Sequence, residues 1–324
     1  MLSKIAYKLH SGKNNKLAYM TKNYLLQLVP DCFFRKRLSR VLSSLDTRSD
    51  KDYIVRRVDY CCKLLPGAHL PEDAPAVGKR DKRWHKVYWF DSVECTRWFD
   101  PKLRWVFLPG DINFIPEVPS IVKSRPVEGD NANGVLLKLN KVRHFIFVKD
   151  EIPFREKKDV VVFRGKVKDK EQRVRFFEQY FCHPMCDLGD ISRNYREHAE
   201  WRVDKMTIRD HLRYKFILAL EGNDVASNLK WVMSSNSVAV MPRPTCETWF
   251  MEGTLKPDYH YIEIRPDFSD LEDKLSYYIE HPEEAEAISH HANEYVEQFK
   301  DKERERLISL LVMDKYFSMT GQKQ

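Results

Sequence analysis

The chain has 324 residues, of which 43% are hydrophobic and 12% aromatic, and its formal net charge is +7. This length suits two domains of about 150 residues each, and the apolar content fills two cores and excludes a globally disordered chain. The positive charge favours anionic partners such as nucleotides, nucleic acid or anionic lipid head groups.

The N-terminal segment, residues 1–45, carries nine lysines and arginines and a single acid, Asp31. Apolar residues recur at helical spacing on both sides of Pro30, which predicts two amphipathic helices that break there. A basic amphipathic helix is typical of a membrane-surface segment, and equally of a helix packed on its own domain with a solvated basic face. Residues 1–9 lack the apolar run of a signal peptide, so we expect none.

The next segment alternates short apolar runs with turns. Residues 53–65 predict a helix, and residues 135–139 fit a helix or an extended segment. The predicted strands are residues 87–90, 105–108, 145–149 and 160–163. Residues 149–159 are charged and contain proline, which predicts a linker between two domains.

After this linker the alternation of strands and helices restarts. Further strands are expected at residues 216–220, 237–241 and 260–264, and helices at 170–181, 207–214, up to 232, 271–280, 282–299 and 302–317. This order predicts an α/β fold, with a parallel sheet covered by helices on both faces. We place the domains at residues 46–155 and 156–300, with 301–324 a C-terminal helix able to pack back on the first domain.

Two turns in the second half carry the candidate donor-binding residues. Residues 162–166 deliver Arg164 and Gly165 to a loop, and Arg173 follows on the next helix. Guanidinium groups bind diphosphate, and glycine lets the backbone approach it. The alternative is an ordinary strand end with solvated charges.

In the second turn an apolar strand ends at a glycine and a helix is expected to begin at once. Its candidates are Glu221, Gly222, Ser227, Asn228 and Lys230. Backbone N–H groups and the helix dipole there favour a phosphate-bearing ligand. The alternative is a plain turn in which Asp224 or Ser227 caps the helix.

Three further candidates carry side chains suited to sugar transfer. Glu247 is suited to accept hydrogen bonds from ribose or sugar hydroxyls. Asp111 follows a predicted strand and is either a turn former or the base that takes the acceptor's proton. A basic strip is either a site for a phosphorylated acceptor or a solvated face; its members are Lys123, Arg125, Lys138 and Arg143.

The seven cysteines are odd in number and irregularly spaced, which argues against a disulfide framework and for a reducing compartment. Cys182 and Cys186 flank His183, but no second ligand pair follows at zinc-site spacing, so we expect no metal site. No stretch of about eighteen apolar residues occurs. We therefore expect a cytoplasmic protein.

Taken together these stretches resemble glycosyltransferase family 90, most closely its bacterial lipopolysaccharide core branch. The family also includes eukaryotic protein O-glucosyltransferases and fungal capsule xylosyltransferases. The matching stretches are residues 106–112, 122–126, 136–145, 163–165, 220–231 and 247–250. Residues 221–231 are the most specific of them.

The resemblance implies a GT-B fold, with two Rossmann-like domains facing across a cleft and the donor held mainly by the C-terminal one. It implies a UDP-sugar co-substrate, inversion at the anomeric carbon and no obligatory metal. It also implies Asp111 as base and Arg173 as the phosphate-binding arginine. Lys230 stands where eukaryotic members often have an arginine.

The branch implies a lipid A–core oligosaccharide acceptor and a location at the cytoplasmic face of a Gram-negative inner membrane, with peripheral contact to anionic lipid. In the expected reaction Asp111 accepts the acceptor's proton, and Arg164, Arg173, Lys230 and the N–H groups near Ser227 stabilise the leaving UDP. Two other interpretations remain, a non-catalytic scaffold of the same fold and a basic nucleic-acid-binding protein. The second lacks basic–aromatic alternation, zinc-finger spacing and an RNP-type signature, so we expect no nucleic-acid partner beyond the nucleotide.

Overall fold

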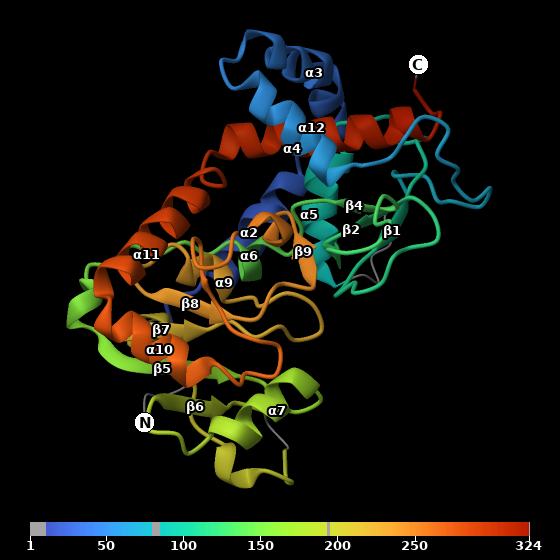
Figure 1. Ribbon diagram of the computed structural model, residues 1–324. Coiled ribbons are helices and arrows are strands. Elements are labelled where there is room, and N and C mark those ends of the chain that lie inside the picture. The colour runs from blue at the N-terminus through green and yellow to red at the C-terminus, as the bar shows by residue number, and fades with distance from the viewer. Residues whose placement is uncertain (1–10, 80–84, 193–194, 324) are drawn as a thin grey trace. The chain divides into compact units, whose positions relative to one another are not determined.

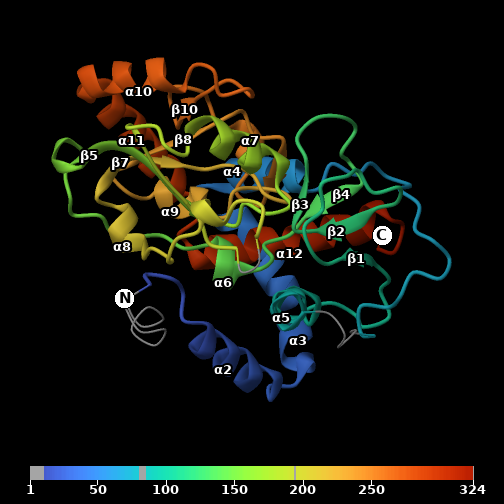
Figure 2. The same ribbon diagram turned by 90° about the horizontal axis from the view of Figure 1, so that it is seen from below.

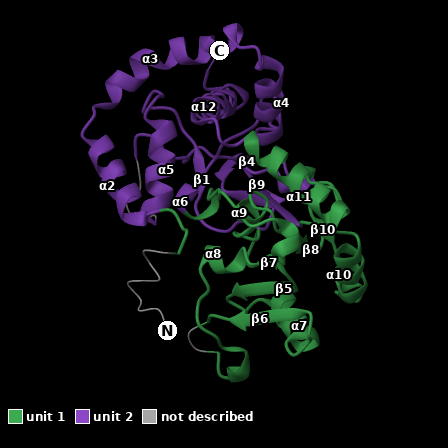
Figure 3. Cartoon of the chain, turned by 90° about the vertical axis from the view of Figure 1, so that its left-hand side faces the viewer, with its two compact units in different colours: residues 1–14, 143–244, 254–298 green, residues 15–142, 245–253, 299–324 purple. Residues whose placement is uncertain are grey.

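The computed structural model describes residues 11–79, 85–192 and 195–323. The chain forms two compact units (Figure 3). Unit 1 comprises residues 1–14, 143–244 and 254–298, and unit 2 comprises residues 15–142, 245–253 and 299–324. The charged segment 149–159 lies inside unit 1, and the C-terminal helix lies in unit 2. No helix in the described part of the chain is long and apolar enough to cross a membrane.

Unit 1 is built on a five-stranded parallel sheet with the order β10-β8-β7-β5-β6. Its strands are β5 (Lys158–Gly165), β6 (Cys186–Asp190), β7 (Tyr214–Leu218), β8 (Val238–Met241) and β10 (Ile262–Glu263). Every residue of β7 and β8 is buried, as expected for parallel strands covered on both faces. The parallel α/β architecture predicted for this half is confirmed.

The helices of unit 1 connect and flank these strands (Figure 1). They are α7 (Glu171–Tyr180), α8 (Ile208–His211), α9 (Leu229–Val232), α10 (Leu271–Glu280) and α11 (Pro282–Glu297). Phenylalanines dominate the core beneath α7 and α10, where Phe176 packs edge-to-face on Phe268 with ring centroids 5.0 Å apart. The short α6 (Lys141–His144) lies where the chain passes from unit 2 to unit 1.

The strand order of this sheet reverses between β5 and β7. The chain moves from β5 to β6 on one side, and then to β7, β8 and β10 on the other side. In open parallel α/β sheets, ligands bind outside the carboxyl ends of the strands at such a reversal. The turns after β5 and β7 are the two turns that the sequence marks as candidates.

Unit 2 contains a three-stranded parallel sheet and a two-stranded antiparallel one. The first has the order β1-β2-β4, and the second pairs β3 with β9. The strands are β1 (Val106–Leu108), β2 (Ser120–Val122), β3 (Ser124–Pro126), β4 (Gly134–Leu136) and β9 (Cys246–Thr248). The 105–108 strand is thus confirmed, and residues 134–136 take the extended alternative.

The helices of unit 2 are α2 (Lys16–Gln27), α3 (Asp31–Ser43), α4 (Lys51–Cys61), α5 (Lys86–Thr96) and α12 (Lys302–Met319). The break between α2 and α3 at Pro30 is confirmed (Figure 2). Asp301 begins α12, because its carboxylate accepts hydrogen bonds from the N–H groups of Glu303 and Arg304. α12 packs against α3, α4 and α5.

Three predictions of secondary structure are wrong. Residues 87–90 belong to helix α5. Most residues of this helix are buried, so its sequence does not show the polar face that recurs with helical period in a surface helix. Residues 145–149 form no strand. The helix expected directly after Gly222 is only the single turn α9, because Gly222, Asn223 and Asp224 favour turns over helix.

Candidate functional site

Arg173 joins the two turns at the strand-order reversal of unit 1. Its Nε donates to the carbonyl of Glu221 (2.9 Å), Nη2 to that of Leu220 (2.7 Å) and Nη1 to that of Lys166 (2.8 Å). The first two carbonyls follow β7 and the third follows β5. Three of the roughly five N–H donors of a guanidinium are therefore used for structure, which leaves one on each terminal nitrogen.

The charge of Arg173 is poorly compensated. Burial, helped by the nearby cation of Arg143, lowers the pKa of Arg173 to about 10, although the carboxylate of Glu221 acts in the opposite direction. The group remains a cation at neutral pH. Its guanidinium lies 5.3 Å from the ring centre of Phe163, a favourable but weak contact. An anion at these turns would supply the missing counter-charge.

The two glycines at these turns make room for neighbouring side chains. A Cβ atom on Gly165 would clash with the ring of Phe163, and one on Gly222 would lie 3.1 Å from Nη2 of Arg173. Neither position tolerates a larger residue without displacing its neighbour. These contacts explain why glycine stands at both turns.

The loop after β7 presents some of its candidates and buries others. Glu221, Gly222, Ser227 and Asn228 are partly exposed, whereas Lys230 is fully buried. The amide of Asn228 donates to the carbonyl of Leu218 (2.9 Å), so that it closes the loop against the strand it follows. The structure thus brings Gly165, Arg173, Glu221 and Gly222 together.

Arg164 does not join this group. Its guanidinium donates to the carboxylate of Asp187 on β6 and to the carbonyl of the same residue (2.7 Å). Asp187 pairs with Val162, two residues back along the sheet. The charge of Arg164 is therefore held beside the sheet rather than at the turn.

Asp111 and its partner follow the carboxyl ends of two adjacent parallel strands in unit 2. Asp111 lies three residues after β1, Lys123 lies directly after β2, and the ammonium of Lys123 donates to the carboxylate of Asp111. The Lys123 side chain is 2% exposed and that of Asp111 is 24% exposed. The carboxylate of Asp111 is thus held by a buried ammonium and remains partly exposed to solvent.

Arg125 and Glu247 form an internal pair. They stand directly opposite each other on β3 and β9, with Nε of Arg125 2.8 Å from Oε1 of Glu247. Arg125 is 0% exposed and Glu247 is 1% exposed. Arg125 also donates to the carbonyls of Tyr60 (2.7 Å) and Gly134 (2.9 Å), and the Tyr60 hydroxyl donates to Glu247. Both charges are therefore compensated inside unit 2.

Lys138 is likewise held by its own fold, whereas Arg143 is not. The ammonium of Lys138 lies 2.7 Å from the buried carboxylate of Glu305, and burial lowers the pKa of Lys138. Arg143 is exposed on α6 and belongs to unit 1 with Arg173. The basic strip expected from the sequence is therefore not one surface.

Two residues of the site were missed by the sequence analysis. Asp190, at the end of β6, is 1% exposed and accepts from the N–H of Val167 (2.9 Å), which fixes the loop after β5. The ammonium of Lys170 donates to the side chain of Asn223, which links the two turns a second time. A carboxylate directly after a glycine at a strand end was a usable signal for Asp190; no local pattern marks Lys170.

Comparison with known proteins finds a matching family and several similar proteins. The family model described as "Glycosyl transferase family 90" matches residues 137–316. A protein named O-glucosyltransferase LpsA, from Dichelobacter nodosus, is 40% identical over 308 residues, which cover 94% of this chain and 96% of that protein. An uncharacterized protein, 027R of Frog virus 3, is 28% identical over 174 residues, which cover 43% of this chain and 18% of that protein.

Proposed function

The chain belongs to glycosyl transferase family 90 and is a glycosyltransferase, and from this premise we propose that it transfers a hexose or pentose from a UDP-sugar to a lipopolysaccharide core acceptor. The observation that carries the donor assignment is the guanidinium of Arg173 at the strand-order reversal of unit 1. The name of the relative, O-glucosyltransferase LpsA, supports glucose as the first sugar to test and an acceptor in lipopolysaccharide synthesis.

The diphosphate of the donor would be bound at the turns after β5 and β7. The two remaining N–H groups of Arg173 are suited to phosphate oxygens, and Gly222 lets this guanidinium lie close to the backbone of the turn. The partly exposed Glu221, Ser227 and Asn228 offer groups for hydroxyls of the donor. Fixed positive charge at a leaving diphosphate stabilises the transition state, and on this ground we propose no obligatory metal.

The proposed chemistry is an inverting displacement. The acceptor hydroxyl gives its proton to Asp111 while its oxygen bonds to the anomeric carbon, and the bond from that carbon to UDP breaks with the electron pair leaving on the phosphate. The proposal assigns donor binding to unit 1 and proton abstraction to unit 2. The GT-B arrangement implied by the resemblance is part of the same proposal.

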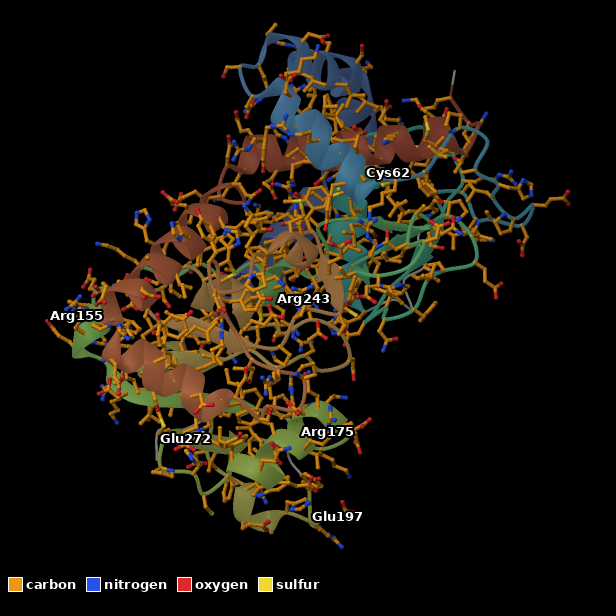
Figure 4. All side chains as sticks on the ribbon, viewed as in Figure 1. Cys62, Arg155, Arg175, Glu197, Arg243 and Glu272 are labelled. Atoms are coloured by element: carbon orange, nitrogen blue, oxygen red, sulfur yellow. The ribbon has the colours of Figure 1, made fainter. Side chains whose placement is uncertain are left out.

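Replacement of Arg173 by alanine is expected to weaken UDP binding by roughly 10- to 100-fold, because charge-assisted hydrogen bonds to phosphate are lost. Calorimetric titration with UDP, GDP and CMP, with and without magnesium, measures this. Arg175→Ala is the matched control, since Arg175 is an exposed arginine on the same helix (Figure 4). Equal binding by both variants, or no UDP binding by the wild type, contradicts the donor site.

We further propose that α2 contacts the membrane. One face of α2 packs on unit 2, where the Tyr19 hydroxyl donates to Asp91 (2.6 Å) and Asn23 is buried. The other face exposes leucines: Leu17 is 76% exposed, Leu25 60% and Leu28, directly after the helix, 78%. Apolar side chains beside a basic segment are typical of helices at an anionic bilayer surface.

Leu25→Glu is expected to reduce binding to vesicles that contain phosphatidylglycerol by about tenfold or more, because a buried leucine contributes about 1.5–3 kcal/mol. Co-sedimentation with vesicles measures it. Leu65→Glu is the control, since Leu65 is 77% exposed in the same unit but lies outside α2. An equal loss in both variants would show that α2 has no special role.

A further inference from the structure

A second basic site, unrelated to the two turns, lies in unit 2 between α3 and α12, which lie side by side (Figures 1 and 3). It is a pocket of about 340 Å³. Four arginines and one carboxylate contribute to its lining: Arg37, Arg40, Arg48, Arg306 and Glu303. We refer to it as the arginine pocket.

Three of these arginines lack a counter-charge of their own. Within the described part of the chain, the guanidinium groups of Arg37, Arg40 and Arg306 form no hydrogen bond or ion pair, and all three residues are exposed. Arg48 differs, because its Nε lies 2.6 Å from Asp50. Cations gathered around one pocket repel each other, so that an anion bound among them is favoured.

The placement of these arginines suits a phosphate group. Arg37 and Arg40 lie three residues apart on one face of α3, and Arg306 faces them from α12 across the pocket. Planar guanidinium forks match the oxygens of phosphate. The volume lies near the lower end of the range of about 300–1,000 Å³ for ligand sites, which fits a phosphate ester rather than a whole glycolipid.

We propose that the arginine pocket binds a phosphate ester carried by the acceptor. This inference rests on the proposed function for the identity of the acceptor, whereas the pocket's affinity for phosphate does not depend on it. Most residues of the basic strip that the sequence suggests for this role are already paired, since Lys123, Arg125 and Lys138 each bind a carboxylate of unit 2. The arginine pocket, in contrast, brings three exposed arginines of unit 2 together around one hollow.

The test titrates inorganic pyrophosphate into the full chain in the presence of saturating UDP, so that the proposed donor site is occupied. The double variant Arg40→Gln with Arg306→Gln is expected to bind pyrophosphate about tenfold more weakly or worse. The double variant Arg35→Gln with Lys36→Gln is the matched control, because it removes two exposed charges from α3 that do not line the pocket. Unchanged thermal unfolding of both variants shows that the fold is intact.

Selective loss in the pocket variant supports the site, and equal binding by the two variants overturns it. A parallel titration with UDP alone reports on the donor site, so failure of that site is seen separately from failure of the pocket. Co-sedimentation with phosphatidylcholine vesicles, with and without phosphatidic acid, identifies the source of the phosphate. Weaker binding of only the pocket variant to the vesicles with phosphatidic acid assigns the site to a phosphate borne by a lipid, as on a membrane-bound acceptor. A defect seen with pyrophosphate but not with these vesicles assigns it to a soluble phosphate ester and overturns the role in binding such an acceptor.

Discussion

Asp111→Asn is expected to reduce the rate of sugar transfer by about 10²–10⁴-fold, the contribution typical of a general base, while leaving UDP binding unchanged. Asparagine keeps the shape of the side chain but cannot take a proton. Asp111 lies in unit 2 and the proposed diphosphate site lies in unit 1, so the substitution separates the chemical step from donor binding. The measurement is turnover of UDP-glucose with the core oligosaccharide, together with calorimetric titration of UDP.

A structural role for Asp111 predicts a different result, because its carboxylate is the partner of the buried ammonium of Lys123. Asp111→Asn combined with Lys123→Met removes both charges, so stability recovers while a catalytic defect remains. Asp59→Asn is the control for the substitution itself, since Asp59 also pairs with a lysine, Lys315, at 2.7 Å in the same unit. Normal transfer by the Asp111→Asn protein would mean that Asp111 is not the base.

Strand β6, which carries Asp187 and Asp190, was not predicted from the sequence. Other strands of unit 1 were, because a buried parallel strand that is a continuous apolar run is recognisable in the sequence. The residues of β7 and β8 show this plainly, and both were predicted close to their true bounds. Helix α5 was not predictable in the same way. It is buried over most of its surface, so its short apolar run at residues 87–90 fits a strand equally well.

The residues of the candidate site also differ in how far the sequence predicts their surroundings. Gly165 and Gly222 were found because they stand at or shortly after a strand end, which fixes where the next residues lie, and Arg173 was found because it lies on the helix that follows the first of these turns. The internal pairing of Arg125, Glu247 and Lys138 could not be predicted, because the partner of each lies more than a hundred residues away in the sequence. In the sequence, a charged residue that faces solvent cannot be distinguished from one that pairs with a distant counter-ion.

Long-range pairs of this kind also link α12 to distant segments of unit 2. Glu305 is 3% exposed, and three groups from distant segments donate to it: Arg57 (3.2 Å), Lys138 (2.7 Å) and the indole of Trp249 (2.6 Å). Burial alone lowers the pKa of Arg57, but the charge of Glu305 and other nearby groups raise it overall. One carboxylate thus compensates two cations and orients a tryptophan.

Glu305→Ala is therefore expected to lower the free energy of unfolding by about 3–5 kcal/mol, the cost typical of leaving buried charges unpaired. Other partners of Arg57 are neutral and do not balance its charge. Its guanidinium donates to the Tyr53 hydroxyl (2.8 Å) and lies 4.8 Å from the ring centre of Phe299 and 5.3 Å from that of Trp249. Urea unfolding followed by tryptophan fluorescence measures the change, and near-native spectra in the absence of urea confirm that the variant folds.

Two further variants separate the lost charge from the truncated side chain. Glu305→Gln keeps the length and can still accept hydrogen bonds, so its cost is expected to lie between those of the wild type and Glu305→Ala. Glu303→Ala removes an exposed carboxylate from the same helix and is expected to change stability by no more than about 0.5 kcal/mol. If Glu305→Ala and Glu303→Ala cost the same, Glu305 contributes no more than a surface charge. The apolar contacts of α12, rather than this buried cluster, would then account for its attachment to unit 2.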